Sequence, residues 1–378
     1  MPDTRKADVI VIGAGIAGAS VAYELSTTHR VLLLEREPQP GLHSTGRSAA
    51  IFSEIYGNPV IRGLSRATRD FLFSPPPGFA QAPLVTPRAT LFLAPPDQVE
   101  TLRAMRNDAD VAAGTEPMSV DEAVRRVSIL RRDRIAEALF EPGASDIDVN
   151  ALHQGFLRRF KARGGELICS VQIAALDKKA DTWRAVAGDT VYEAPVVVNA
   201  AGAWADTVAE LAGLKALGIE PRRRTVVLLD PPAGVDIRDW PLTIDADETF
   251  YFKPDAGRIL LTPADETPTP PCDAQPEEMD IALAIDRFEN MTTMSVRRVV
   301  HKWAGLRSFA PDRTPVVGFD PGAPGFFWLA GQGGYGMQTS SAMARAAASL
   351  VKGEDLPTDI RAQNVSAAAL SPTRLRQT

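Results

Sequence analysis

Short apolar runs and an amphipathic segment alternate at the start of the chain. Residues 9–12 form an apolar run, an amphipathic segment follows to about residue 26, and residues 31–34 form a second apolar run that ends in Glu35. Apolar runs of this length, bounded by turn residues, are typical of buried strands, whereas the longer segment between them is typical of a helix. The pattern predicts a strand, a helix and a parallel strand, which form a βαβ unit.

Glycines occupy the turn between the first strand and the helix of this unit. Gly13 permits a sharp turn, Gly15 lets backbone amides approach a pyrophosphate, and Gly18 lets the helix pack closely on the strand. The helix N-terminus favours phosphate, and Glu35 is placed to accept hydrogen bonds from ribose hydroxyls. The unit therefore predicts a bound adenine dinucleotide. Glu35 argues against the 2′-phosphate of NADP, and the choice between NAD and FAD stays open at this point.

Two later apolar runs also lead through small residues into helical segments. The strands are expected at 196–198 and 326–329, and the turn 331–334 is expected to open an Ala-rich helix to about residue 351. A further helix, capped by Asn150, is expected to end near residue 160, before a strand over 166–170. Such turns bring helix amides to the carboxyl edge of a parallel sheet, where ligands bind.

The segments between these parts have a different pattern. Residues 86–145 and 216–303 contain β-rich runs separated by Pro and Gly turns, with a capping box at Ser119 and a Pro-led helix start at Pro276. The tract 263–276, rich in Pro, Thr and acids, is expected to be an exposed loop. The β-rich runs include 225–229, 249–252 and 258–261.

The expected fold class is α/β, with two domains. A Rossmann-like dinucleotide-binding domain would comprise residues 1–85, 146–215 and 304–378, and residues 86–145 and 216–303 would form an inserted, β-rich α+β substrate domain. The chain of 378 residues, of which 45% are hydrophobic, is long enough for both cores.

Composition and charge exclude several classes of partner. The formal net charge is -6 and the basic residues are scattered among acids, so nucleic acid is not an expected partner. Cys169 and Cys272 lie far apart and share no metal-type spacing with the four histidines, so neither a metal site nor a disulfide is expected. No apolar run reaches membrane-spanning length and no leader pattern precedes residue 9. We expect a cytoplasmic protein without an integral membrane segment, with peripheral membrane contact left open.

Motifs along nearly the whole chain carry a family resemblance. They are GAGIAGAS, LERE, GLHSTGRSAA, DVNALHQGFLRRF, VVNAAGAWAD, RRRT, FYFKPD, WAGLRSF and GQGGYGMQTS. In this order they resemble the D-amino acid oxidase superfamily of flavin-dependent oxidoreductases, with the nearest likeness to bacterial FAD-dependent D-arginine dehydrogenases. The resemblance, and no spacing by itself, implies that the cofactor is FAD.

The resemblance also implies which residues contact the cofactor. They come from the glycine turn and its acid, the STGRS loop, the position that meets adenine, a second glycine turn, and the loop and helix start that face the flavin. These residues are Gly13, Gly15, Ile16, Ala17, Gly18, Glu35, Arg36, Ser44, Thr45, Arg47, Ser48, Val171, Ala201, Gly202, Trp204, Gly331, Gly333, Gly334, Tyr335, Gly336, Met337 and Gln338.

The substrate residues are implied in the same way. Arg307 matches the family arginine that binds the substrate carboxylate, with Arg224, Tyr251 and Tyr56 as helpers. A carboxylate buried beside a flavin needs a planar bidentate donor and further hydrogen bonds. The residues alone leave other interpretations open: a surface charge for Arg224, a structural ion pair for Arg307 and an interfacial core residue for Tyr251.

Two positions depart from the arginine-specific pattern. Ile51 stands where those enzymes carry His, and Thr90 stands where they carry Glu; Gly334 and Tyr335 complete the expected pocket. A guanidinium would lose its carboxylate partner there, so neutral or apolar side chains are expected. The alternative is a substitute carboxylate from one of the acids close in sequence to the pocket segments, which are Glu54, Asp245, Asp247 and Glu248.

The expected reaction is oxidation of D-amino acids to imino acids by hydride transfer from Cα to flavin N5, with oxygen, a quinone or another acceptor as the second partner. The alternatives are oxidation of a secondary amine or a 2-hydroxy acid, and a non-catalytic flavoprotein.

Overall fold

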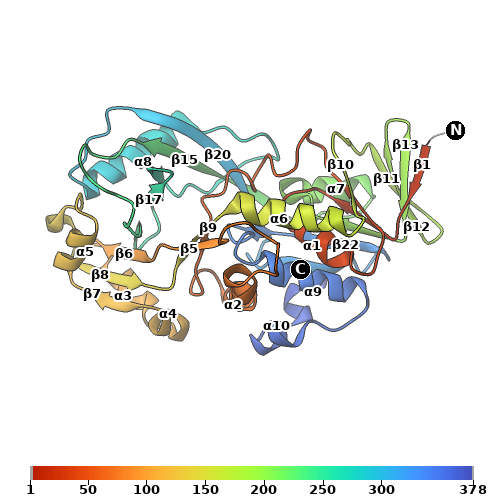
Figure 1. Cartoon of the computed structure of the whole chain (residues 1–378), viewed down its shortest axis with the longest axis horizontal. Coiled ribbons are helices and arrows are strands. Elements are labelled where there is room, and N and C mark those ends of the chain that lie inside the picture. The colour runs from red at the N-terminus through yellow and green to blue at the C-terminus, as the bar shows by residue number, and fades with distance from the viewer. Residues whose placement is uncertain (1–2, 377–378) are drawn as a thin grey trace.

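A six-stranded sheet lies in the right half of the molecule in Figure 1, in the computed structural model, which describes residues 3–376. Its strands are parallel except for the last, which is antiparallel to its neighbour. In spatial order the strands are β10 (Glu166–Ile168), β3 (Val31–Leu34), β2 (Val9–Ile12), β14 (Val196–Asn199), β22 (Phe326–Ala330) and β21 (Val316–Phe319). The predicted βαβ unit is confirmed, with β2 beside β3.

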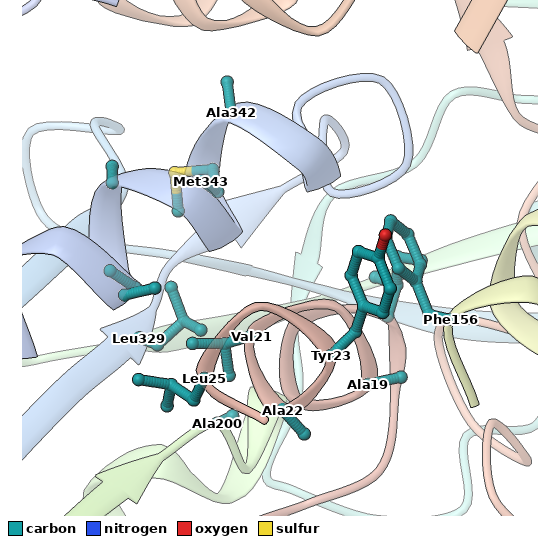
Figure 2. Close-up of a cluster of buried hydrophobic side chains, with 14 of the residues drawn as sticks. Ala19, Val21, Ala22, Tyr23, Leu25, Phe156, Ala200, Leu329, Ala342 and Met343 are labelled. Atoms are coloured by element: carbon teal, nitrogen blue, oxygen red, sulfur yellow. The ribbon is translucent and has the colours of Figure 1, made fainter. Parts of the chain in front are cut away.

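Both faces of this sheet are covered. On one face α1 (Ile16–Leu25) lies against α6 (Val149–Ala162) and α9 (Ser340–Val351). Figure 2 shows this core, in which Tyr23 of α1 lies against Phe156 of α6 and Leu25 lies near Leu329 of β22. The other face packs on α7 (Ala205–Leu211) and on a small sheet. The small sheet consists of β1 (Asp3–Lys6), β13 (Thr190–Ala194), β12 (Thr182–Ala187) and β11 (Ala175–Lys179). Burial on both faces explains why the parallel strands are continuous apolar runs.

A ten-stranded, mostly antiparallel sheet lies on the other side of the molecule, at the left in Figure 1. Its order is β23 (Gln332–Gly333), β20 (Val299–Phe309), β15 (Glu220–Leu229), β18 (Arg258–Thr262), β17 (Tyr251–Asp255), β16 (Leu242–Asp245), β6 (Thr90–Ala94), β8 (Glu137–Glu141) and β7 (Glu116–Met118), with β19 (Thr267–Pro268) beside β15. The expected α/β class, with a Rossmann-like domain and a β-rich second part, is confirmed.

The two faces of the large sheet have different roles. One face packs on α5 (Val120–Arg126) and α8 (Glu278–Met291), and Phe250 and Phe252 point into that core. Tyr251, between them, belongs to a separate cluster with Phe92 and Ile244 on the opposite face. This alternation, which the strand pattern predicts, turns Tyr251 toward the rest of the molecule.

Shorter elements connect these sheets. They are β4 (Ile51–Phe52), β9 (Ser145–Ile147) and β5 (Val85–Pro87), which form a three-stranded sheet, and the helices α2 (Pro59–Phe73), α3 (Val99–Met105), α4 (Ala109–Gly114), α10 (Thr358–Ala362) and α11 (Ala367–Leu370). No helix among residues 3–376 is long and apolar enough to span a bilayer.

Several local predictions are wrong. Asp148, not Asn150, caps α6 by accepting from the Ala151 amide at 2.8 Å. The strand after α6 ends at Ile168 instead of residue 170. The helix expected to open at 331–334 begins at Ser340, because Gln332 and Gly333 form β23 on the edge of the large sheet.

The tract 263–276 is not exposed throughout. The Asp265 side chain is buried and accepts from the Thr225 amide at 2.6 Å, and Ala274 is buried against Ala304 and Leu306. The expected domain boundary at residue 304 also falls inside β20, so the strands of the large sheet extend past it.

Candidate active site

A cavity of about 710 Å³ lies between the carboxyl edge of the six-stranded sheet and the inner face of the ten-stranded sheet. It runs from Glu35 and Val171 to Tyr251 and Arg307, so it has one end at the glycine turn and the other at the large sheet. All of the expected cofactor and substrate residues line it except Gly18, Gly331 and Gln338. Among residues 3–376 no group of His, Cys, Asp and Glu is arranged to hold a metal ion.

The three exceptions have structural roles. A Cβ atom on Gly18 would lie 1.8 Å from the Gly13 carbonyl oxygen, so Gly18 provides the expected close helix packing. Gly331 has a φ of +72°, which other residues rarely adopt. The buried Gln338 amide accepts from the Ser53 amide at 3.1 Å and donates to Ser65 at 2.9 Å. Gln338 thus holds the pocket wall together without lining it.

The glycine turn presents an uncapped helix N-terminus to the cavity. Gly13 has a φ of +96°, and no side chain caps α1 at Gly15. Glu35 is buried and accepts from the amides of Ala14 at 2.7 Å and Glu37 at 3.0 Å. These bonds fix the carboxylate at the point where a ribose is expected, and each of its oxygens can accept a further hydrogen bond.

A buried histidine, which the sequence did not identify, supports this turn. His153 of α6 lies 2.9 Å from the Ala14 carbonyl oxygen through Nε2. Burial lowers the pKa of His153 below its ordinary value, so the ring is neutral near pH 7 and its Nε2–H donates to that carbonyl.

The loop after β3 joins the cofactor end to the large sheet. Ser44 donates to the Leu306 carbonyl at 2.6 Å, and Thr45 accepts from the Ile16 amide at 2.9 Å. Arg47 donates to the carbonyls of Ala304 at 3.0 Å and Ala274 at 2.9 Å. The Arg47 guanidinium therefore joins the loop to the large sheet through these hydrogen bonds.

Aromatic and charged side chains cover the dinucleotide end. The Arg36 guanidinium lies 4.3 Å from the centre of the Trp204 ring, and the His43 ring centre lies 4.8 Å from it. His43 Nε2 is 2.9 Å from a Glu37 oxygen, and hydrogen bonds from His43 and then Arg36 hold the pKa of Glu37 below its usual value. His43 therefore binds Glu37 through Nε2 and packs against the Trp204 ring.

Arg307 is at the centre of the substrate end. Its surroundings are the phenol groups of Tyr56, Tyr251 and Tyr335, and the Tyr56 and Tyr335 ring centres are 5.0 Å apart. Burial raises the pKa of Tyr335, so its phenol is neutral. Glu248 lines the same cavity: burial raises the pKa of Glu248, and the charges of Arg307 and then Arg224 oppose the rise.

Arg224 lies beside Arg307 and is not a surface charge, because only 11% of its side chain is exposed. It donates to Glu266 at 3.3 Å, and Glu266 also binds Arg313 at 2.9 Å. Burial, followed by the charge of Arg307, lowers the pKa of Arg224. This end of the cavity therefore has two adjacent cations, of which Arg224 shares the partly exposed Glu266 with Arg313.

The side-chain pocket contains an acid that the sequence did not identify. Ile51 and Thr90 line the cavity as expected, but so does Glu141 at the end of β8. Its carboxylate is buried and accepts from the Ser53 hydroxyl at 2.6 Å. The inference that this pocket had lost its acid is therefore wrong: the acid comes from the neighbouring strand.

Comparison with known proteins places this geometry in a family. The FAD dependent oxidoreductase family matches residues 8–350. The FAD-dependent oxidoreductase domain-containing protein 1 of Xenopus laevis is 25% identical over 92% of this chain and 79% of its own length. Among solved structures, glycine oxidase from Geobacillus kaustophilus has a TM-score of 0.83 at 20% identity, covering 98% of this chain and 99% of its own. Iminodiacetate oxidase from Chelativorans sp. BNC1 has a TM-score of 0.80 at 22% identity, covering 93% and 96%.

The chain belongs to the FAD dependent oxidoreductase family. The uncapped start of α1, the fixed Glu35 carboxylate and the long cavity fit the cofactor FAD. The protein is accordingly an FAD-dependent oxidoreductase. The narrower resemblance to D-arginine dehydrogenases is not supported, because the similar structures include oxidases of glycine and iminodiacetate.

Proposed function

We propose that the protein oxidises an amino acid, of the D configuration where Cα is chiral, to the imino acid, which water then hydrolyses to a 2-oxo acid and ammonia. The observation that carries the proposal is Arg307, a buried cation beside the phenol groups of three tyrosines at one end of the cofactor cavity, where Glu248 is a neighbouring acid. An unpaired buried guanidinium is costly, and a planar carboxylate is the ligand that best offsets this cost. The similar structures named for glycine and iminodiacetate, whose names denote carboxylate-bearing amines, support this class of substrate.

The chain's own residues would bind and orient the substrate. Arg307 would take the carboxylate as a bidentate donor, and the hydroxyls of Tyr56 and Tyr251 would donate to its remaining lone pairs. When bound, the flavin supplies the oxidant, which accepts a hydride from Cα at N5. The two tyrosines and Arg307 hold Cα in one orientation, which is the main contribution that a protein makes to such a step.

The wall beside Tyr251 is partly apolar. Ile51, Phe92 and Ile244 line it and would contact the carbon chain of the substrate's side chain. The same wall could receive the second arm of a secondary amine, and the likeness to iminodiacetate oxidase favours this second candidate.

Anaerobic reduction of the flavin tests these proposals. The panel pairs D- and L-alanine, D- and L-methionine, glycine with N-methylglycine, and D-alanine with D-lactate. We expect bleaching of the flavin absorbance by the D-amino acids. Faster reduction by N-methylglycine than by any primary amine would favour the second candidate, and reduction by D-lactate alone would favour a 2-hydroxy acid. Failure of every compound would support a non-catalytic flavoprotein.

A further inference from the structure

Glu141 and Thr90 face each other at the ends of two paired strands. They are direct partners in the antiparallel register of β8 and β6, and both are at least nine-tenths buried. Ser53 follows β4, is also buried, and donates to Glu141 Oε1. All three residues line the cavity. A carboxyl group is thus directed into the ligand space with two hydroxyls as its polar neighbours.

None of the side chains that act on the Glu141 carboxyl group is basic. Arg88 and Lys253 both bind Asp146, at 2.6 Å each. Arg69 binds Glu54 at 3.2 Å, and Glu54 is the charged group whose field reaches Glu141. Arg307 and Arg224 are on β20 and β15, and at least four strands of the large sheet lie between these and β8. Glu141 therefore has neutral partners only, and a buried acid in such a place has unused capacity for a hydrogen-bond donor or a cation.

We propose that Glu141, Ser53 and Thr90 form a second subsite of the cavity, which binds the hydrogen-bond-donating or cationic end of a substrate side chain. This inference rests on the proposed function, because the substrate carboxylate is assigned to Arg307. It names the substrate class more closely: amino acids with a terminal ammonium, guanidinium or hydroxyl group.

The sheet sets the distance between the two subsites. Tyr251 at the carboxylate end is on β17, and β16 and β6 separate it from β8. Three strand spacings amount to about 14 Å between backbones. The Tyr251 and Glu141 side chains project into this space, so a ligand of several methylene groups is needed to span it.

The ionisation of Glu141 makes the second subsite dependent on pH. Burial raises the pKa of Glu141 to about 7, hydrogen bonds from Ser53 and Thr90 oppose the rise, and the charge of Glu54 adds to it. The protonated carboxyl group has no charge to attract a cation, whereas the carboxylate does. The ionised fraction rises from about one-tenth at pH 6 to about nine-tenths at pH 8, as expected for a single group with a pKa of about 7.

Ligands that lack an α-amino group test the subsite without turnover. The FAD-loaded enzyme is titrated with 4-aminobutanoate, 5-aminopentanoate and 6-aminohexanoate, and with the matching unsubstituted alkanoates, while the flavin absorbance spectrum reports binding. We expect the affinity ratio of the best aminoalkanoate to its alkanoate to rise about tenfold from pH 6 to pH 8, in proportion to the ionised fraction of Glu141.

Two variants separate the subsite from general charge effects. Glu141→Gln keeps the size and a hydrogen-bonding group, and we expect its affinity ratio to be low and independent of pH. Glu137→Gln is the matched control, because Glu137 is on the same strand β8, binds Arg103 and does not line the cavity; its ratio should follow the wild type.

The outcomes distinguish the two proposals. A ratio in the wild type that does not change with pH, or an unchanged rise in Glu141→Gln, would overturn the second subsite while alkanoate binding still supports Arg307. Absence of binding by every carboxylate would overturn the carboxylate site and the proposed function with it.

Discussion

Gly334 packs directly against the guanidinium of Arg307: a Cβ atom at residue 334 would lie 2.9 Å from Arg307 Cζ and 2.9 Å from Nη1. The guanidinium is therefore held between the 331–338 loop and the large sheet, with the tyrosines around it. A group fixed in this way loses little side-chain freedom when a ligand binds, which favours its assignment as the carboxylate donor.

Replacement of Arg307 tests this assignment. Arg307→Ala should lower kcat/KM for amino acids by about 100-fold or more, since loss of one partner of a buried charge pair typically costs ~2–5 kcal/mol. Arg307→Lys should also be poor, because an ammonium cannot reproduce the bidentate contact. Arg298→Ala, at a position whose side chain is 72% exposed, is the control. Near-normal turnover by Arg307→Ala would place the carboxylate elsewhere.

A change at Gly15 tests the dinucleotide end. A Cβ atom there would lie 3.1 Å from Thr45 Oγ1, so the branched side chain of Gly15→Val would enter the space where the phosphates are expected. We expect the purified variant to lose FAD, measured as flavin absorbance per protein. Gly143→Val, in an exposed turn where a Cβ atom meets nothing within 4 Å, should retain it. A fully yellow Gly15→Val protein would contradict this assignment.

The hydrogen bonds from Arg47 to the Ala274 and Ala304 carbonyls should stabilise the folded protein and increase its affinity for FAD. Arg47→Ala leaves the carbonyls of two buried residues, Ala274 and Ala304, without this donor, at a cost of about 1–3 kcal/mol for each unsatisfied group. The thermal midpoint and the FAD dissociation constant measure the effect. Asp273→Asn removes only the 63% exposed ion-pair partner, and we expect less than about 1 kcal/mol. Equal effects of the two changes would show that the carbonyl contacts contribute little.

The pKa of Glu141 predicts a pH-dependent stability. The folded protein holds this proton up to a pH of about 7, whereas an unfolded glutamate releases it near 4.5. The protonated group thus contributes its full stability below pH 4.5 and loses it as pH rises to about 7. Glu141→Gln should therefore gain stability relative to the wild type between pH 4.5 and pH 8, by on the order of 3 kcal/mol. Chemical denaturation at several pH values measures the difference, and a pH-independent difference would mean that the carboxyl group is not desolvated.

Local patterns predicted the parts of the fold whose cause is local. The strands β2 and β3 can be predicted because burial on both faces makes them apolar throughout. The turn between β2 and α1 can be predicted because the positive φ of Gly13 and the close backbone contact at Gly18 both require glycine. The start of α9 was missed because Gln332 and Gly333 pair with β20, a contact between distant segments that no helix signal reports.

The distinction between local patterns and contacts of distant segments also applies to the candidate active site. Arg307, Tyr251 and Tyr56 were identified because they lie within motifs that resemble the family. Glu141 was missed because it enters the pocket through its register with Thr90, and the two are far apart in the sequence. An isolated glutamate at the end of a short strand has no pattern of its own, so only the paired strands reveal it.

The strands of the six-stranded sheet come from separate segments of the chain, and this constrains the order in which the sheet can form during synthesis. Its strands come from residues 9–34, 166–168, 196–199 and 316–330, so β22 pairs with β14 only after most of the chain has left the ribosome. Domains that are continuous in sequence fold as they emerge during synthesis. In this protein the edge of β2 that pairs with β14 stays unpaired during synthesis until β14 has been made. Flavin loading is therefore expected only after β22 has been synthesised, and nascent chains are expected to need protection from aggregation until then.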